Sequence, residues 1–252
     1  REGFSISLHA SGDDSLLILL FERLDGKKLL LYNFACHPTV TGPENLMITA
    51  DFPYAVERDL DYDMVMFVNS NAGNISTRFT RIDSSFEQVE IYKTRIIRGI
   101  LNTLKSPVYQ GNFNDIAMKR YPITLPIKKV RSVMEEKAAL ASHEENLEKA
   151  VAAGKDALTL RLLSTYVEGG KIAVGLSKAL QGLEEIPAHF TIMKLQGITI
   201  AVVPGELFST LGVPLKQEGI EIFGYGNGYY LYLADEKSYD DMVYEAMSSP
   251  FR

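Results

Sequence analysis

The stretch Lys28–Thr39, with the sequence KLLLYNFACHPT, decides the fold and carries the first indication of a site. It begins with an apolar run of strand length, and Leu16–Phe21 is a second such run upstream. The Asp-Gly pair at residues 25–26 lies between them and is a strong hairpin signal. Pro38 has no N–H for a sheet hydrogen bond, so the strand should end near His37. The stretch therefore predicts a hairpin whose second strand ends in a histidine.

Two further apolar strands are also followed by unusual polar motifs. Met64–Val68 leads into a loop of small polar residues, Asn69–Ser76, and Ile198–Val203 leads into Pro-Gly-Glu, which ends at Glu206. Ligands of open α/β sheets bind beyond the carboxyl ends of the strands. If the three strands run parallel, their motifs should meet at one sheet edge. The pattern predicts a site that contains an imidazole and a carboxylate.

The remaining pattern predicts helices and strands in alternation. Helical spacing or capping signals predict helices at Asp51–Leu60, Phe86–Leu104, Val133–Val151, Asp156–Val167, Ile172–Leu183, Glu206–Gln217 and Glu236–Met247, with Gly169-Gly170 as a break. Further extended segments are expected at Asn112–Ile127, Phe190–Leu195, Glu221–Phe223 and Tyr229–Leu233. We expect an α/β fold, a layered domain with a mixed β-sheet flanked by helices. The helical insertion covers about residues 131–183 of a single domain over residues 1–252.

Composition and charge exclude several classes of protein. The chain has 252 residues, a net charge of −6 and no Lys/Arg block, which argues against nucleic acid as the partner. No stretch of 18 apolar residues exists, so the sequence predicts no transmembrane segment. Cys36 is the only cysteine, so no disulfide forms within the chain. The chain starts at Arg1 without Met, and we therefore expect a processed or trimmed piece.

Each motif also has a purely structural interpretation. A histidine after a strand is often a hydrogen-bonded structural residue, and a glutamate such as Glu206 suits the positive end of a helix. The loop before Ser76 could be a tight turn in which glycine supplies a positive φ. The tyrosines near the C-terminus would most often fill the core. The residues alone leave these alternatives open.

Together, four segments resemble motifs of the neutral (non-lysosomal) ceramidase family, zinc-dependent amide hydrolases. They are NFACHPT at 33–39 with ITAD at 48–51, NAGNIS at 71–76, VPGE at 203–206, and NGYYLY at 227–232, which continues without a gap through 246. They occur in the family's order from about residue 28 to residue 246. A single motif of this kind is weak, but four in order make chance similarity a poor explanation.

The resemblance implies a role for individual residues. Zinc would be held by His37, Glu206 and Tyr232, and zinc takes nitrogen and oxygen donors of this kind. Ser76 and Tyr244 would be catalytic. Ser76 would act either as a nucleophile or, as we favour, by holding the substrate amide while metal-bound hydroxide attacks, and Tyr244 would donate a hydrogen bond to the developing oxyanion. The loop residues that would bind substrate are Asn71, Gly73 and Asn74.

Two expectations of geometry follow. His37, the loop over residues 71–76 and the start of a helix at Glu206 should lie together at one sheet edge. In an extended segment over residues 229–233 the side chains alternate between faces. Tyr232, rather than Tyr229 or Tyr230, should then face the metal.

The chain also departs from the family's pattern. The family's first zinc histidine lies in a His-Thr-His-Ser-Gly-like motif upstream, and no such motif occurs here. We therefore expect one further zinc ligand from a segment outside this chain, which could lie on another chain. Asn74 stands where the family has Asp, and Thr77-Arg78 stands where it has Pro-Asn.

The resulting hypothesis is a zinc-dependent hydrolase that cleaves the N-acyl bond of ceramide or a related lipid-like substrate. The resemblance implies an extracytoplasmic or secreted protein. The alternatives are a metal-independent serine hydrolase that uses Ser76, and a non-catalytic binding module that has lost its metal.

Overall fold

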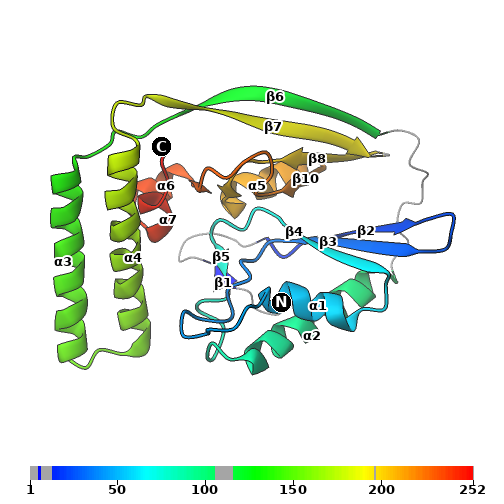
Figure 1. Ribbon diagram of the computed structural model, residues 1–252, viewed down its shortest axis with the longest axis horizontal. Coiled ribbons are helices and arrows are strands. Elements are labelled where there is room, and N and C mark those ends of the chain that lie inside the picture. The colour runs from blue at the N-terminus through cyan, green and yellow to red at the C-terminus, as the bar shows by residue number, and fades with distance from the viewer. Residues whose placement is uncertain (1–4, 7–12, 106–115, 196, 252) are drawn as a thin grey trace.

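The computed structural model describes residues 5–6, 13–105, 116–195 and 197–251. Within these residues the strands form four sheets, and seven helices surround them (Figure 1). The strands are β1 (Ser5–Ile6), β2 (Leu16–Glu22), β3 (Lys28–Phe34), β4 (Met64–Asn69), β5 (Ile75–Ser76), β6 (Ile116–Pro126), β7 (Glu185–Leu195), β8 (Ile198–Val202), β9 (Glu206–Leu207), β10 (Ile220–Phe223) and β11 (Tyr232–Leu233). The helices are α1 (Asp51–Asp59), α2 (Phe86–Thr103), α3 (Val133–Ala152), α4 (Ala157–Ala179), α5 (Ser209–Gln217), α6 (Glu236–Asp240) and α7 (Tyr244–Met247). The expected layered α/β class is confirmed.

The predicted hairpin forms the first sheet, in the order β2-β3-β4. β2 pairs antiparallel with β3 across a turn in which Gly26 has a φ of 83°, and β3 pairs parallel with β4. Helices α1 and α2 cover one face of this sheet (Figure 1). The core between them includes the fully buried rings of Tyr32 and Phe52 and the almost fully buried Tyr92. Parallel pairing of β3 and β4 brings their carboxyl ends to the same edge, as predicted.

The second sheet has the order β10-β8-β7-β6, and the α3–α4 hairpin is inserted between its two long strands β6 and β7 (Figure 1). The predicted break at Gly169-Gly170 is wrong, because α4 is one continuous helix. Both glycines are packing sites. A Cβ on Gly169 would lie 2.6 Å from Met247 Cε, and one on Gly170 would lie 3.2 Å from Leu140 Cδ1. Both glycines therefore lie where α3 and α7 pack closely against α4, and a side chain at either position would displace the side chain of Met247 or Leu140.

Three C-terminal expectations also need correction. Glu206 does not begin a helix: it lies in β9, and α5 starts at Ser209. Of the expected strand at residues 229–233 only Tyr232–Leu233 pairs, because Leu231 has a φ of 63° and turns the chain. The expected last helix is divided into α6 and α7 at Met242, which has a φ of 51°. The expected extended segment starting at residue 112 is strand from Ile116, and residues 112–115 lie outside the described part.

The two larger sheets meet at the ends of β4 and β10. Gly224 N–H donates to Asn69 O at 2.9 Å. The buried amide of Asn33 donates to Val68 O at 2.9 Å and to Ile222 O at 3.1 Å, and so ties both sheets to one side chain. The three motifs therefore meet at the junction of two sheets, which corrects the expectation of one sheet edge. Among the helices of the described residues, none is long and apolar enough to cross a membrane.

Candidate functional site

His37 and Ser76 are brought together by the parallel pairing of β3 and β4. Beyond the ends of these strands, His37 N–H donates to Ile75 O at 3.0 Å, and His37 forms a parallel bridge with Ser76. Ser76 Oγ accepts a hydrogen bond from Arg78 N–H at 3.0 Å. Both side chains border the same cavity. The backbone thus brings His37 and Ser76 to the same cavity.

Glu206 is positioned by the loop that contains Gly73 and Asn74. Gly73 N–H donates to Leu207 O at 2.9 Å, and Asn74 Oδ1 accepts from Ser209 N–H at 2.8 Å. A Cβ on Gly73 would lie 2.4 Å from Glu206 O, so only glycine permits this approach of two backbones. The loop therefore holds the short strand β9 and its glutamate in place.

The imidazole of His37 and the carboxylate of Glu206 face each other. His37 Nε2 lies 3.1 Å from Glu206 Oε2, but Nε2 is buried and has no hydrogen bond of acceptable geometry. Tyr225 O–H donates to Glu206 Oε2 at 3.2 Å, and its oxygen lies 3.2 Å from His37 Nδ1. When the hydroxyl proton is donated to Glu206, the hydrogen bond between Tyr225 and His37 has Nδ1–H as its donor. In that tautomer Nε2 carries the imidazole lone pair, which is the form that binds a metal.

The carboxylate of Glu206 is held in its charged form. Burial alone would raise its pKa, but the neighbouring His37 and the hydroxyls of Tyr229 and Tyr225 outweigh burial and hold the pKa below its ordinary value. Tyr229 O–H donates to Glu206 Oε1. Burial and the Glu206 charge in turn raise the pKa of Tyr225. The tyrosines are therefore neutral donors to a buried anion.

Tyr232 lies at the same point. β11 pairs parallel with β9 in a register that places Tyr232 opposite Glu206. Its ring packs edge-on against His37, with centroids 6.3 Å apart, and against Tyr244, with centroids 6.0 Å apart. Burial, followed by the Glu206 charge, raises the pKa of Tyr232. Tyr230 points elsewhere, because its hydroxyl donates to Pro187 O at 3.1 Å.

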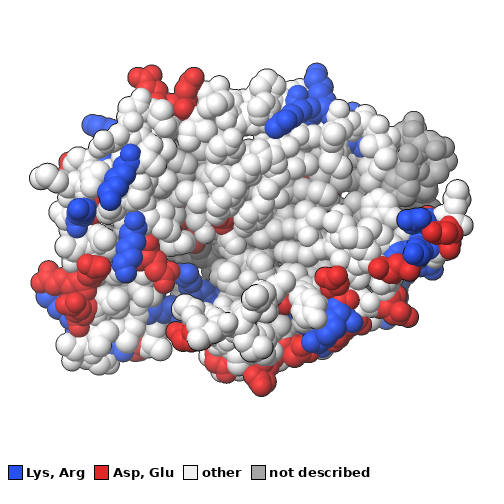
Figure 2. Space-filling view, viewed as in Figure 1, with Lys and Arg blue, Asp and Glu red and all other residues white. Residues whose placement is uncertain are grey.

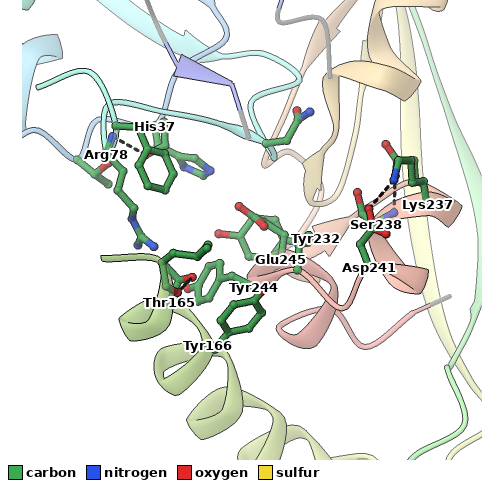
Figure 3. Close-up of a pocket in the computed structure, with 17 residues that line it drawn as sticks. His37, Arg78, Thr165, Tyr166, Tyr232, Lys237, Ser238, Asp241, Tyr244 and Glu245 are labelled. Atoms are coloured by element: carbon green, nitrogen blue, oxygen red, sulfur yellow. Dashed lines mark hydrogen bonds and ion pairs between the residues drawn. The ribbon is translucent and has the colours of Figure 1, made fainter. Parts of the chain in front are cut away.

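A cavity of about 480 Å³ opens beside these residues, between the sheet junction, α4 and the C-terminal helices (Figure 3). His37, Ser76, Tyr232 and Tyr244 border it, together with Asn74. The other two predicted substrate-binding residues, Asn71 and Gly73, are not among its lining residues. Asn71 is fully buried, accepts from Ser70 Oγ at 2.8 Å, and lies so close to α5 that a Cβ on Gly212 would come within 2.5 Å of it.

Sequence reasoning missed four residues of this region. Tyr225 and Tyr229 bind Glu206, and Arg78 and Glu245 border the cavity. The positive φ values of Tyr225 (61°) and Asn227 (65°) turn the chain back on itself, so strand alternation does not apply here. For the two tyrosines the only available signal was the density of tyrosines, which is equally typical of core packing.

The residues present fit a metal ion in part. In the described ranges, no three His, Cys, Asp or Glu side chains gather as a metal-binding group. However, Nε2 of His37 lies 3.1 Å from a carboxylate oxygen without a hydrogen bond, a contact that a cation or proton between the two atoms would make favourable. A phenol oxygen from Tyr232 would be a third donor. His9, which could replace the missing histidine, lies outside the described residues.

Comparison of the sequence with protein-family models and with curated proteins finds no match. Two solved structures resemble the chain over most of its length. The neutral ceramidase from Pseudomonas aeruginosa has a TM-score of 0.56 at 15% identity, covering 93% of this chain and 43% of that chain. A ceramidase complexed with C2 has a TM-score of 0.57 at 14% identity, covering 94% of this chain and 44% of that chain.

These likenesses show the fold. The chain spans less than half the length of either structure. The resemblance to neutral ceramidases that the four sequence motifs indicate is therefore confirmed at the level of fold.

Proposed function

We propose that this chain carries most of the active site of a zinc-dependent amide hydrolase that cleaves the N-acyl bond of ceramide or a related lipid-like substrate. The observation that carries the proposal is the buried Nε2 of His37, which lies 3.1 Å from the carboxylate of Glu206 without a hydrogen bond among the described residues. The four ordered motifs and the fold shared with two ceramidase structures support the same class of reaction.

His37, Glu206 and Tyr232 would hold the metal, with one further ligand from outside the described residues. A bound Zn²⁺ would polarise the amide carbonyl and activate water. Tyr225 has a supporting role, because its hydroxyl links His37 Nδ1 to Glu206 and orients both ligands. Such partners hold the ligand tautomer and ring orientation that binding needs.

Ser76 and Tyr244 would act on the substrate. Ser76 pairs with His37 through the backbone and borders the cavity, where its hydroxyl would hold the amide. The Tyr244 ring packs against Tyr232, and burial raises the pKa of Tyr244, so it is a neutral O–H donor for the developing oxyanion. Asn74 accepts a hydrogen bond from the first residue of α5 and also borders the cavity. It would therefore both hold the start of α5 in place and bind substrate.

The test is hydrolysis of an N-acyl substrate by the full-length gene product before and after chelation. We expect a short-chain ceramide to be cleaved, activity to disappear with a chelator, and Zn²⁺ to restore it. Glu206→Gln should lose activity with little change in side-chain volume. Glu87→Gln is the matched control, because Glu87 is exposed in the first turn of α2.

The alternatives give different results. Full activity in the chelator, lost in Ser76→Ala, would contradict zinc dependence and favour the serine hydrolase. A protein that binds the substrate without cleaving it, with or without zinc, would favour the non-catalytic binding module.

A further inference from the structure

Three arginines lie near one another next to the cavity. Arg78 lies two residues after Ser76 and borders the cavity, Arg81 follows in the same loop, and Arg161 lies in the first part of α4. Burial lowers the pKa of Arg81, and the charges of Arg161 and Arg78 lower it further, so the three guanidinium groups interact. Basic side chains are visible between the α3–α4 hairpin and the body of the molecule in Figure 2.

Two of the three arginine side chains donate hydrogen bonds to backbone carbonyl groups. Arg161 Nη1 donates to Arg78 O, and Arg81 Nη1 donates to Thr39 O. Arg81 Nε is buried without a hydrogen-bond partner among the described residues. These two side chains therefore contribute positive potential and hold the loop. They leave Arg78 as the arginine that borders the cavity.

The Arg78 guanidinium has one ring contact and one exposed ion pair, so it can also bind a ligand. Its guanidinium lies 5.5 Å from the ring centroid of Tyr244, and Nη2 lies 3.3 Å from Glu168 Oε2. The Glu168 side chain is 53% exposed, so this ion pair is weak and can exchange for another carboxylate. Glu168, Asp51 and the cavity-lining Glu245 offset part of the charge of the three arginines. Arg78 is thus the arginine at the cavity that can exchange its exposed ion pair for a ligand carboxylate.

On the basis of the proposed amide hydrolysis, we propose that the substrate is an N-acyl amide whose amine half carries a carboxylate, as in an N-acyl amino acid. The Arg78 guanidinium lies 5.5 Å from the ring centroid of Tyr244, and Ser76, Arg78 and Tyr244 all border the cavity, so the amine half of an amide held between Ser76 and Tyr244 would lie near this guanidinium. A planar guanidinium binds a carboxylate through two parallel hydrogen bonds. Water would add OH to the acyl carbon and H to the nitrogen as the C–N bond breaks, giving a fatty acid and an amino acid.

The experiment compares N-dodecanoyl-glycine with the neutral N-dodecanoyl-glycinamide and with N-dodecanoyl-taurine, which carries a sulfonate. We expect kcat/KM for the glycine compound to exceed that for the glycinamide by about ten-fold or more, as one charge-assisted bidentate contact would give. Arg78→Gln should reduce this ratio to near one, and Arg78→Lys should retain part of it. Equal loss on the taurine compound would mean that Arg78 recognises anions in general, which would contradict selection of a carboxylate.

Arg58→Gln is the matched control, because Arg58 lies in an exposed ion-pair network with Asp59 and Glu90 on α1 and α2. Its ratio should equal that of the wild type. Binding of the same compounds by calorimetry gives a readout without turnover. Selective binding without any hydrolysis would contradict the proposed function and support the anion site. If the glycine and glycinamide compounds were hydrolysed or bound equally well, the anion site alone would be contradicted. If neither compound were hydrolysed or bound, the proposed function and the anion site would both be contradicted.

Discussion

At the scale of single residues, Tyr225 links the two central side chains of the site. Its hydroxyl lies 3.2 Å from Glu206 Oε2 and 3.2 Å from His37 Nδ1, so it can support the His37 tautomer whose lone pair is on Nε2. We expect Tyr225→Phe to weaken Zn²⁺ binding by about 10- to 100-fold, the usual effect of losing such a support. The measurement is competition for Zn²⁺ with a metal-binding dye.

Tyr230→Phe is the control for this experiment, because the Tyr230 hydroxyl donates to Pro187 O and not to the site. Circular dichroism should show both variants folded. Unchanged Zn²⁺ affinity in folded Tyr225→Phe would mean that the hydrogen bonds around His37 have no role in a metal site.

At the scale of elements, the loop that contains Gly73 determines where β9 lies. A side chain at this position would collide with the backbone at Glu206 O, 2.4 Å away, and neither backbone can move freely. We expect Gly73→Ala to lower the free energy of unfolding by about 1–3 kcal/mol, the cost of inserting a methyl group into a packed site. Urea denaturation followed by fluorescence or circular dichroism measures this change.

Gly175→Ala is the matched control, because its Cβ would meet nothing within 4 Å and Gly175 is exposed in α4. That variant should gain about 0.5–1 kcal/mol, since alanine favours helix over glycine. Equal stability of the two variants would show that the loop does not restrain β9.

The elements also show how much of the structure could be predicted from sequence. The strands before His37 and Ser76 were predicted correctly, because apolar runs of strand length are local signals and pairing then follows. The strand position of Glu206 was missed, because Pro-Gly-Glu is also typical of a helix start. Gly169 was mistaken for a helix break, because its contact with Met247 is tertiary and has no local signal.

The site residues also divide into those that sequence motifs identify and those that they do not. His37, Glu206 and Tyr232 could be chosen because motifs in the family's order contain them. Tyr229 could not, because the positive φ of Leu231 ends the strand alternation on which its orientation was judged.

At the scale of the whole molecule, the site depends on the junction of two sheets. His37 follows a strand of one sheet, and β9, which carries Glu206, follows β8 of the other. Asn33 joins the sheets through its hydrogen bonds to Val68 O and Ile222 O. We expect Asn33→Leu to lower the free energy of unfolding by about 1–3 kcal/mol, because buried carbonyls lose a donor. Hydrolysis should fall as well, since the two sheets would no longer be held in register.

Asn102→Leu is the control, because Asn102 is exposed on α2. Denaturation and activity should both match the wild type. If Asn33→Leu were as stable and as active as this control, the sheet junction would have no part in positioning the site.

The central claim is that His37 and Glu206 bind a zinc ion together. Crystals of the full-length gene product grown with Zn²⁺ and measured at the zinc absorption edge test it most directly. We expect an anomalous peak about 2 Å from His37 Nε2 and from a carboxylate oxygen of Glu206, and loss of this peak in His37→Ala. A map at saturating Zn²⁺ with no peak between these two side chains would contradict the account.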